Sequence, residues 1–170
     1  MRIGIPLETK SGESRVAATP ETVKKLITAG HSLIIQSHAG VKASIIDEAF
    51  TAAGATIGSA TEVFNCDIVL KVRAPSDDEL NQMRPGTVLI GMLDPFDSAT
   101  INAMAGKQIT AFALEAAPRT TRAQSMDVLS SQANIAGYKA VMLAANTYQR
   151  FMPMLMTAAG TVKAARVLIL

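Results

Sequence analysis

The stretch DIVLKVRAPSDDELNQMRPGTVLIGML, residues 67–93, decides the fold. Residues 67–72 form an apolar run typical of a buried strand, and a proline soon after interrupts the run. Residues 76–83 predict a helix with Ser76 as its N-cap, and residues 87–93 predict the next buried strand. Two buried strands joined by a helix are typical of a parallel sheet covered by helices.

The same alternation extends through most of the chain. A helix is predicted from Thr19-Pro20-Glu21, where Thr is a favourable N-cap and Pro a favourable first residue, as far as Gly30. Further strands are predicted at residues 2–6, 32–36, 55–57 and 109–114, and further helices at residues 47–53, 60–65 and 98–105. We therefore predict an α/β fold with a parallel sheet covered by helices, of the flavodoxin or Rossmann-like kind.

The C-terminal part follows a different pattern. One long helix is predicted over residues 125–150, with Ser125 as its N-cap and Asp127 in its first turn. A Met-rich loop follows, and then AARVLIL, which has the pattern of a buried strand. The predicted domains are residues 1–124, an α/β domain, residues 125–163, a linking helix and loop, and residues 164–170, the first strand of a further Rossmann domain.

Composition excludes several classes of function. The 170 residues are 49% hydrophobic and carry a net charge of only +2, with no basic run or aromatic platform, so nucleic acid is not an expected partner. No stretch approaches the roughly 18 consecutive apolar residues of a membrane-spanning helix, and the N-terminus has no signal-peptide core. We therefore expect a cytoplasmic protein with no membrane span in this chain.

Several reactive residue types have simple structural interpretations. Cys66 lies in the apolar sequence FNCDIVL and is predicted to be a small buried side chain. His31 and His38 have no partner at metal-ligand spacing, so no metal site is expected. Lys71 is interpreted as structural, at the end of a strand, and the acidic residues 77–79 as the first turn of a helix.

A polar segment, PRTTRAQSMDVLSSQANIAGYKA at residues 118–140, joins the α/β pattern to the long helix. Its candidate ligand-binding residues are Arg119, Gln124, Asp127 and Ser130. Their donors and acceptors suit a carboxamide, which offers one acceptor and two donor hydrogens, and nicotinamide carries that group. For Asp127 alone, a purely structural role at the helix N-terminus stays open.

The sequence RAQSMDVLSSQANIAGYKAV, residues 122–141, is very similar to a loop and helix in the alpha subunit of proton-translocating NAD(P) transhydrogenases. The opening RIGIPLETKSGESRVAATPETVKKL, residues 2–26, resembles the opening shared by transhydrogenases and alanine dehydrogenases. The resemblance covers essentially the whole chain. It implies that this segment contributes to an NAD(H)-binding component.

The resemblance also implies roles for the candidate residues. Arg119, Asp127 and Ser130 would orient the nicotinamide carboxamide of NAD(H), and Gln124 would bridge toward the nicotinamide of NADP(H) on a partner component. Hydride would pass directly between the two nicotinamides, so no general acid or base is needed. The implied partners are the membrane component, through which proton translocation is coupled at the inner membrane, the NADP-binding component and a second copy of the chain.

Alanine dehydrogenase is the first alternative. Arg15 resembles the arginine that binds the substrate carboxylate in those enzymes, although an ion pair with Glu8 or Glu13 would also explain it. Alanine dehydrogenases carry a catalytic lysine where this chain has Arg73, and a catalytic histidine where it has Asp94. An arginine is a poor proton shuttle, so both departures disfavour amino-acid oxidation.

The second alternative is a non-enzymatic assembly module. A strand such as residues 164–170 normally leads into a G-x-G-x-x-G turn that holds a pyrophosphate at a helix N-terminus, and that turn is not in this sequence. We therefore interpret the chain as an N-terminal fragment whose NAD(H) site is incomplete. We expect it to have little or no activity by itself.

Overall fold

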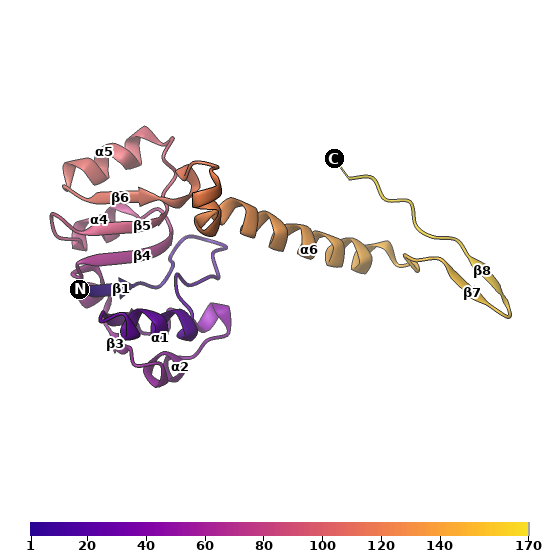
Figure 1. The fold of residues 1–170 in the computed structure, drawn as a ribbon, viewed down its shortest axis with the longest axis horizontal. Coiled ribbons are helices and arrows are strands. Elements are labelled where there is room, and N and C mark those ends of the chain that lie inside the picture. Colours follow the sequence, from indigo (N-terminus) through magenta and orange to yellow (C-terminus); the bar gives the residue numbers. More distant parts are fainter. Residues whose placement is uncertain (170) are drawn as a thin grey trace. The chain divides into compact units, whose positions relative to one another are not determined.

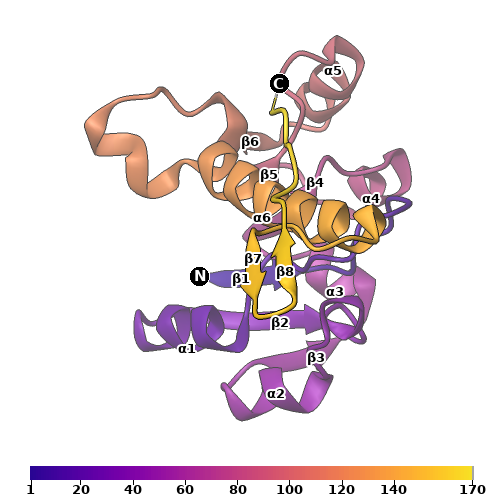
Figure 2. The same cartoon turned by 90° about the vertical axis from the view of Figure 1, so that its right-hand side faces the viewer.

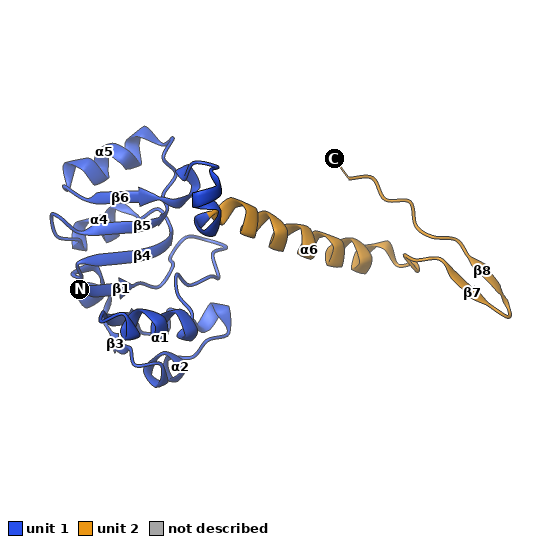
Figure 3. Cartoon of the chain, viewed as in Figure 1, with its two compact units in different colours: residues 1–126 blue, residues 127–170 orange. Residues whose placement is uncertain are grey.

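The computed structural model describes residues 1–169. The chain forms two compact units, an N-terminal unit of Met1–Met126 and a C-terminal unit of Asp127–Leu170 (Figure 3). Leu170 itself lies outside the described residues.

A six-stranded sheet forms the centre of the N-terminal unit (Figure 1). Its strands are β1 Arg2–Ile5, β2 Ser32–Gln36, β3 Thr56–Gly58, β4 Ile68–Arg73, β5 Val88–Met92 and β6 Thr110–Ala113. They lie in the order β3-β2-β1-β4-β5-β6, and every neighbouring pair is parallel. The predicted α/β fold with a parallel sheet is therefore confirmed.

Helices cover both faces of this sheet. They are α1 Pro20–Thr28, α2 Asp47–Ala52, α3 Ala60–Phe64, α4 Asp77–Gln82 and α5 Ser98–Gly106, with a short 3-10 helix η1 at Val41–Ala43. Helix α1 packs beside α2, whereas α3, α4 and α5 pack in a row (Figure 2). Because β3 connects to β4 across the sheet, the first two helices and the last three lie on opposite faces.

Local caps explain where these helices begin. The Thr19 side chain accepts a hydrogen bond from the Thr22 N–H in front of Pro20, as predicted. Ser76 accepts from the Glu79 N–H while the Glu79 carboxylate accepts from the Ser76 N–H, which completes a capping box. The predicted N-caps of α1 and α4 are therefore confirmed.

Two hydrophobic cores lie against the sheet. The first gathers Ile5, Ile35 and Phe50 with the residues that pack beside α1 and α2. The second gathers Val69 and Leu89 with the apolar residues of α3, α4 and α5. Cys66 is a free, buried cysteine, as predicted, and burial raises the pKa of its thiol.

The C-terminal unit consists of helix α6, Val128–Tyr148, and a hairpin of β7, Leu155–Thr157, and β8, Gly160–Val162. The prediction of Ser125 as the N-cap was wrong, because Ser125 lies within the 3-10 helix η3, Thr121–Met126. Asp127 is the N-cap instead. Asp and Ser are comparable caps, so local sequence did not distinguish them.

The Met-rich segment and the residues after it also differ from the predicted pattern. A loop was predicted between α6 and residue 163, but the segment contains the β7–β8 hairpin. Residues 164–169 form no strand within the described chain. A strand is completed by hydrogen bonds to neighbouring strands, so an apolar run alone does not secure one. That residues 164–170 begin a further domain stays a prediction.

Candidate functional site

The carboxyl ends of the parallel strands meet at one edge of the sheet, where ligands commonly bind in open α/β sheets. The loops after β1, β4 and β5 and the segment after β6 all leave from this edge. They carry most of the charged residues that the sequence analysis considered.

A bulge at the end of β4 shapes this edge. The pairing of β4 with β5 shifts by one residue between Leu70 and Arg73. Gly91 lies opposite the bulge, and a Cβ atom there would lie only 2.3 Å from the Lys71 carbonyl oxygen. The Val72 N–H donates to Glu8 Oε1 at 2.6 Å instead of to a strand. The bulge therefore ties the loop after β1 to the end of β4.

Lys71 forms the centre of a buried charged cluster. Its Nζ lies 3.0 Å from Glu79 Oε1 and 3.6 Å from Glu8 Oε2. Thr9 Oγ1 also donates to Glu79 Oε1, at 3.1 Å. The Lys71 side chain is only 1% exposed, so the cluster excludes water and holds the loop after β1, β4 and α4 together.

Sequence reasoning missed this cluster. It took Glu79 as a helix-terminal carboxylate, but Glu79 is buried and pairs with Lys71 as well as completing the cap of α4. Lys71 also lies within β4, two residues before its last residue. A lysine inside the apolar run IVLKV was the available signal, because a buried charge requires a partner.

A second charged cluster lies nearer the surface. Glu13 accepts from Arg15 Nε at 2.7 Å and from Arg73 Nε at 3.0 Å. Of the two residues considered for Arg15, Glu13 forms the ion pair, and the charge of Glu8 also raises the pKa of Arg15. The hydrogen bond from Arg15 and, to a smaller extent, the one from Arg73 lower the pKa of Glu13 to about 2, and the pairing raises the pKa of Arg15.

Arg73 and Asp94, the two departures from the alanine dehydrogenase pattern, line one cavity of about 180 Å³. Lys10, Phe96 and Glu115 line it as well. The Asp94 N–H donates to Glu115 Oε1 at 2.7 Å, and Asp94 has a left-handed backbone with φ 53°. The Glu115 bond supports a conformation that L-residues rarely adopt.

Arg119 and Gln124 lie in the segment that follows β6. Arg119 is in the loop between the 3-10 helices η2, Leu114–Ala116, and η3, and Gln124 is within η3. Both side chains are exposed. The polar groups of both residues are therefore accessible to a ligand.

Asp127 and Ser130 are joined at the start of α6. The Ser130 N–H donates to Asp127 Oδ1 at 3.0 Å, and Ser130 Oγ donates to Asp127 Oδ2 at 2.6 Å. Asp127 is thus the N-cap of α6, which is the structural role that the sequence left open for it. The cap also fixes the carboxylate beside the Ser130 hydroxyl, which keeps its acceptor lone pairs.

The structure brings Asp127 and Ser130 together in the C-terminal unit, whereas Arg119 and Gln124 belong to the N-terminal unit. Within residues 1–169, no group of three or more His, Cys, Asp or Glu side chains is placed to hold a metal ion. In the same described range, no helix combines the length and apolar character needed to cross a membrane.

Comparison with known proteins gives a consistent result. The family profile described as alanine dehydrogenase/PNT, N-terminal domain, matches residues 4–136. An NAD(P) transhydrogenase subunit alpha polypeptide of Rhodospirillum rubrum is 48% identical over 99% of this chain and 46% of its own length. The crystal structure of the transhydrogenase from Sinorhizobium meliloti is similar with a TM-score of 0.93 and 48% identity, over 97% of this chain and 50% of that one.

Alanine dehydrogenase is more distant. A structure of L-alanine dehydrogenase is similar with a TM-score of 0.66 and 32% identity, over 68% of this chain and 32% of that one. The chain spans no more than about half the length of these relatives.

Proposed function

The chain belongs to the family described as alanine dehydrogenase/PNT, N-terminal domain, and from this we propose that it forms part of the alpha subunit of a proton-translocating NAD(P) transhydrogenase. The observation that carries the proposal is the 48% identity to a transhydrogenase alpha subunit across 99% of the chain. The Arg73–Glu13 pair also supports it over alanine dehydrogenase, since a paired arginine is a poor proton shuttle.

In this proposal the chain supplies the nicotinamide end of an NAD(H) site. NAD(H), when bound, supplies the hydride for a nicotinamide of NADP(H) on a partner component. The Asp127 carboxylate accepts from the carboxamide NH₂, Arg119 donates to the carboxamide oxygen, and the Ser130 hydroxyl completes the set. Gln124 bridges toward the partner nicotinamide. The task of these residues is alignment, which requires no proton transfer.

The cap geometry supports the role of Asp127. Its carboxylate is already oriented by Ser130 through two hydrogen bonds, so binding would cost little ordering of that side chain. The pyrophosphate would be held by residues beyond this segment. The NAD(H) site within this segment is therefore incomplete in our proposal, and the segment alone has little or no activity.

The proposed assembly includes partner components of the transhydrogenase and a second copy of the chain, at the cytoplasmic side of the inner membrane. Helix α6 carries exposed apolar side chains, among them Ile135, Val141 and Leu143. These side chains support a protein partner that binds along α6. A helix with apolar residues on all sides is normally buried.

Hydride transfer by the assembled enzyme tests the proposal. Gln124→Asn shortens the proposed bridge by one methylene, so we expect it to abolish hydride transfer while leaving NADH binding intact. Gln82→Asn in α4 is the matched control and should leave both unchanged, because Gln82 is an exposed residue whose side chain bonds to its own helix. Unchanged hydride transfer in Gln124→Asn would reject the role of Gln124.

A further inference from the structure

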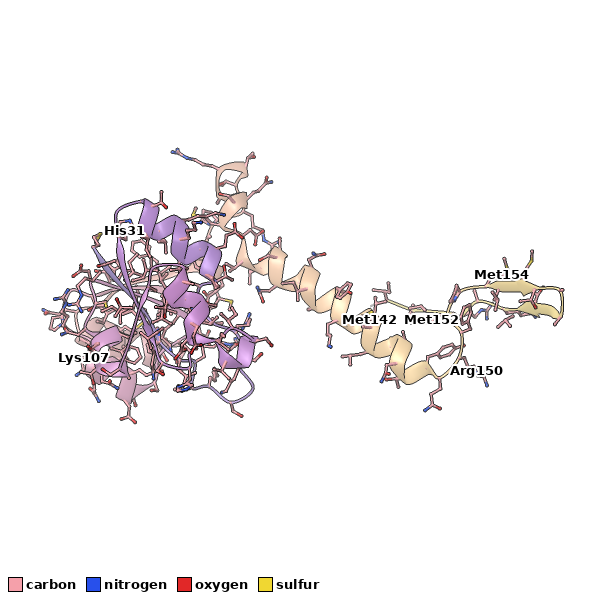
Figure 4. All side chains as sticks on the ribbon, turned by 90° about the horizontal axis from the view of Figure 1, so that it is seen from below. His31, Lys107, Met142, Arg150, Met152 and Met154 are labelled. Carbon is pink, nitrogen blue, oxygen red and sulfur yellow. The ribbon has the colours of Figure 1, made fainter. Side chains whose placement is uncertain are left out.

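Glu115 joins the segment that carries Arg119 and Gln124 to the loop after β5. Its Oε1 accepts a hydrogen bond from the Asp94 N–H at 2.7 Å, although the two residues are 21 positions apart in the sequence. Asp94 lies before α5, which ends at its C-cap Lys107, and Glu115 lies in η2 directly after β6 (Figure 4). The bond therefore closes the β5–α5–β6 crossover at the carboxyl edge of the sheet.

Two features of this contact cost stability. Asp94 has a left-handed backbone, φ 53°, which residues other than glycine rarely adopt. The second carboxylate oxygen of Glu115, Oε2, is buried and accepts no hydrogen bond within residues 1–169. Strained backbone and unpaired buried oxygens are uncommon, and strain of this kind gathers at functional sites. The contact therefore requires an explanation beyond the stability of the fold.

The place of Glu115 in the chain indicates that explanation, because it precedes both Arg119 and Gln124 in the segment after β6. The backbone of this segment is shaped by short-range hydrogen bonds, such as the one from the Ala123 N–H to the Thr120 carbonyl at 3.0 Å. Bonds of this kind shape a turn but do not attach it to the sheet. Glu115 supplies an attachment before Arg119, and the buried Ala123 supplies one after it.

We propose that Glu115 is a positioning residue, which holds the segment of Arg119 and Gln124 at the carboxyl edge of the sheet for hydride transfer. The inference rests on the proposed function, in which these two residues align the nicotinamides. Alignment is sensitive to small displacements, since a shift of about 1 Å can lower a rate about a hundredfold. Glu115 acts through the segment and not by contact with a cofactor.

A purely structural role for Glu115 would be narrower. Glu115 would then only hold Asp94 in its left-handed conformation, and the segment after β6 would keep its position without that bond. The substitution Asp94→Gly distinguishes the two roles. Glycine adopts φ 53° without strain, and it keeps the backbone N–H that donates to Glu115.

Hydride transfer by the assembled enzyme gives the first test. Glu115→Ala removes the acceptor, and we expect kcat to fall at least about tenfold. Glu115→Gln keeps an oxygen acceptor for the Asp94 N–H and should retain most of the rate. Asp94→Gly should leave the rate nearly unchanged, and the double variant Glu115→Ala, Asp94→Gly should be as slow as Glu115→Ala. A wild-type rate in Glu115→Ala or in the double variant would overturn the inference.

Amide hydrogen exchange of the 170-residue chain tests the attachment without the assembled enzyme. Glu115→Ala should speed exchange at Asp94 and at Ala123, whose N–H groups are both hydrogen-bonded. Glu48→Ala is the matched control and should change neither, because Glu48 is exposed on α2, which packs beside β3 at the opposite edge of the sheet. Circular dichroism verifies that each variant folds.

The two measurements separate this inference from the proposed function. Unchanged exchange at Ala123 in Glu115→Ala would overturn the inference and leave the transhydrogenase role intact. A wild-type enzyme that transfers no hydride would reject the proposed function, and the exchange measurement would still decide whether Glu115 holds the segment.

Discussion

The N-terminal unit buries 21 Ala, Val, Ile, Leu, Met, Phe and Cys residues, from Ile3 to Ala123, whereas no described residue of the C-terminal unit is buried. The two units do not differ in apolar content to this degree, since α6 and the hairpin are rich in Ala, Val, Leu and Met. They differ in whether their apolar side chains pack against other helices and strands. The N-terminal unit therefore has a core of its own, whereas the apolar side chains of the C-terminal unit are exposed.

This difference separates stability from interaction. Substitutions in the N-terminal unit should act on the free energy of unfolding, because they disturb packed or paired groups. Substitutions of exposed residues in the C-terminal unit should leave that free energy nearly unchanged and act on binding or assembly. The two units should therefore respond differently to matched substitutions.

The largest effect is expected for Lys71→Met. Removing the ammonium group leaves Glu8 and Glu79 buried without their cation, which should lower the free energy of unfolding by about 3–5 kcal/mol. Urea unfolding of the 170-residue chain measures this loss. Lys25→Met removes an exposed pair with Glu21 and should have almost no effect. Equal effects of the two substitutions would refute the buried cluster.

A matched pair of leucines tests the contrast between the units directly. Leu89→Ala removes a fully buried side chain from β5 and should cost about 3 kcal/mol. Leu143→Ala removes a side chain that is 55% exposed on α6 and should stay within about 0.5 kcal/mol. A large loss of stability in Leu143→Ala would show that α6 is buried in the protein in solution.

The pH dependence of stability tests the Glu13 cluster. Because the pKa of Glu13 falls from 4.5 to about 2 on folding, its contribution is complete above pH 4.5 and is lost as the pH falls toward 2. Both arginine partners are more than a third exposed, so we expect a contribution on the order of 2 kcal/mol after screening. The free energies of unfolding of the wild type and of Glu13→Gln, measured as a function of pH, should converge at low pH. A difference between the two proteins that stays constant with pH would contradict the pairing.

The smallest effect is expected at the start of α6. Asp127→Ala removes the N-cap and should cost about 1 kcal/mol of local helix stability, measured as faster amide exchange in the first turns. Asp127→Asn should preserve the cap, since Asn caps as well as Asp, but it removes the charge. In the assembled enzyme, weaker NADH binding by Asp127→Asn would assign the carboxylate to the ligand. Unchanged binding would leave Asp127 only its structural role.

The sequence predicted the N-terminal unit closely because its signals are local. Thr19 and Ser76 mark helix starts through their own side chains. The apolar run at residues 67–72 predicts strand β4, which pairs with a neighbouring strand on each side. The N-cap of α6 was predicted two residues too early, because Ser125 and Asp127 are equally good caps.

Contacts between residues far apart in the sequence were harder to predict. Glu8 and Lys71 meet because β1 lies beside β4 in the sheet, and no local pattern encodes that neighbour relation. The β4 bulge, which frees the Val72 N–H for Glu8, likewise depends on pairing with β5. The β7–β8 hairpin was not predicted, because two short strands in a Met-rich segment give no clear alternation of apolar and polar residues.

NADH binding tests the central claim most directly. We would titrate NADH into this chain and into a form extended through a dinucleotide-binding domain, each with and without Asp127→Asn. We predict that the extended form binds NADH at least about tenfold more tightly, and that only its binding is weakened by Asp127→Asn. Comparable binding by the short chain, lost on Asp127→Asn, would contradict the account, because residues 119–130 would then be a complete site.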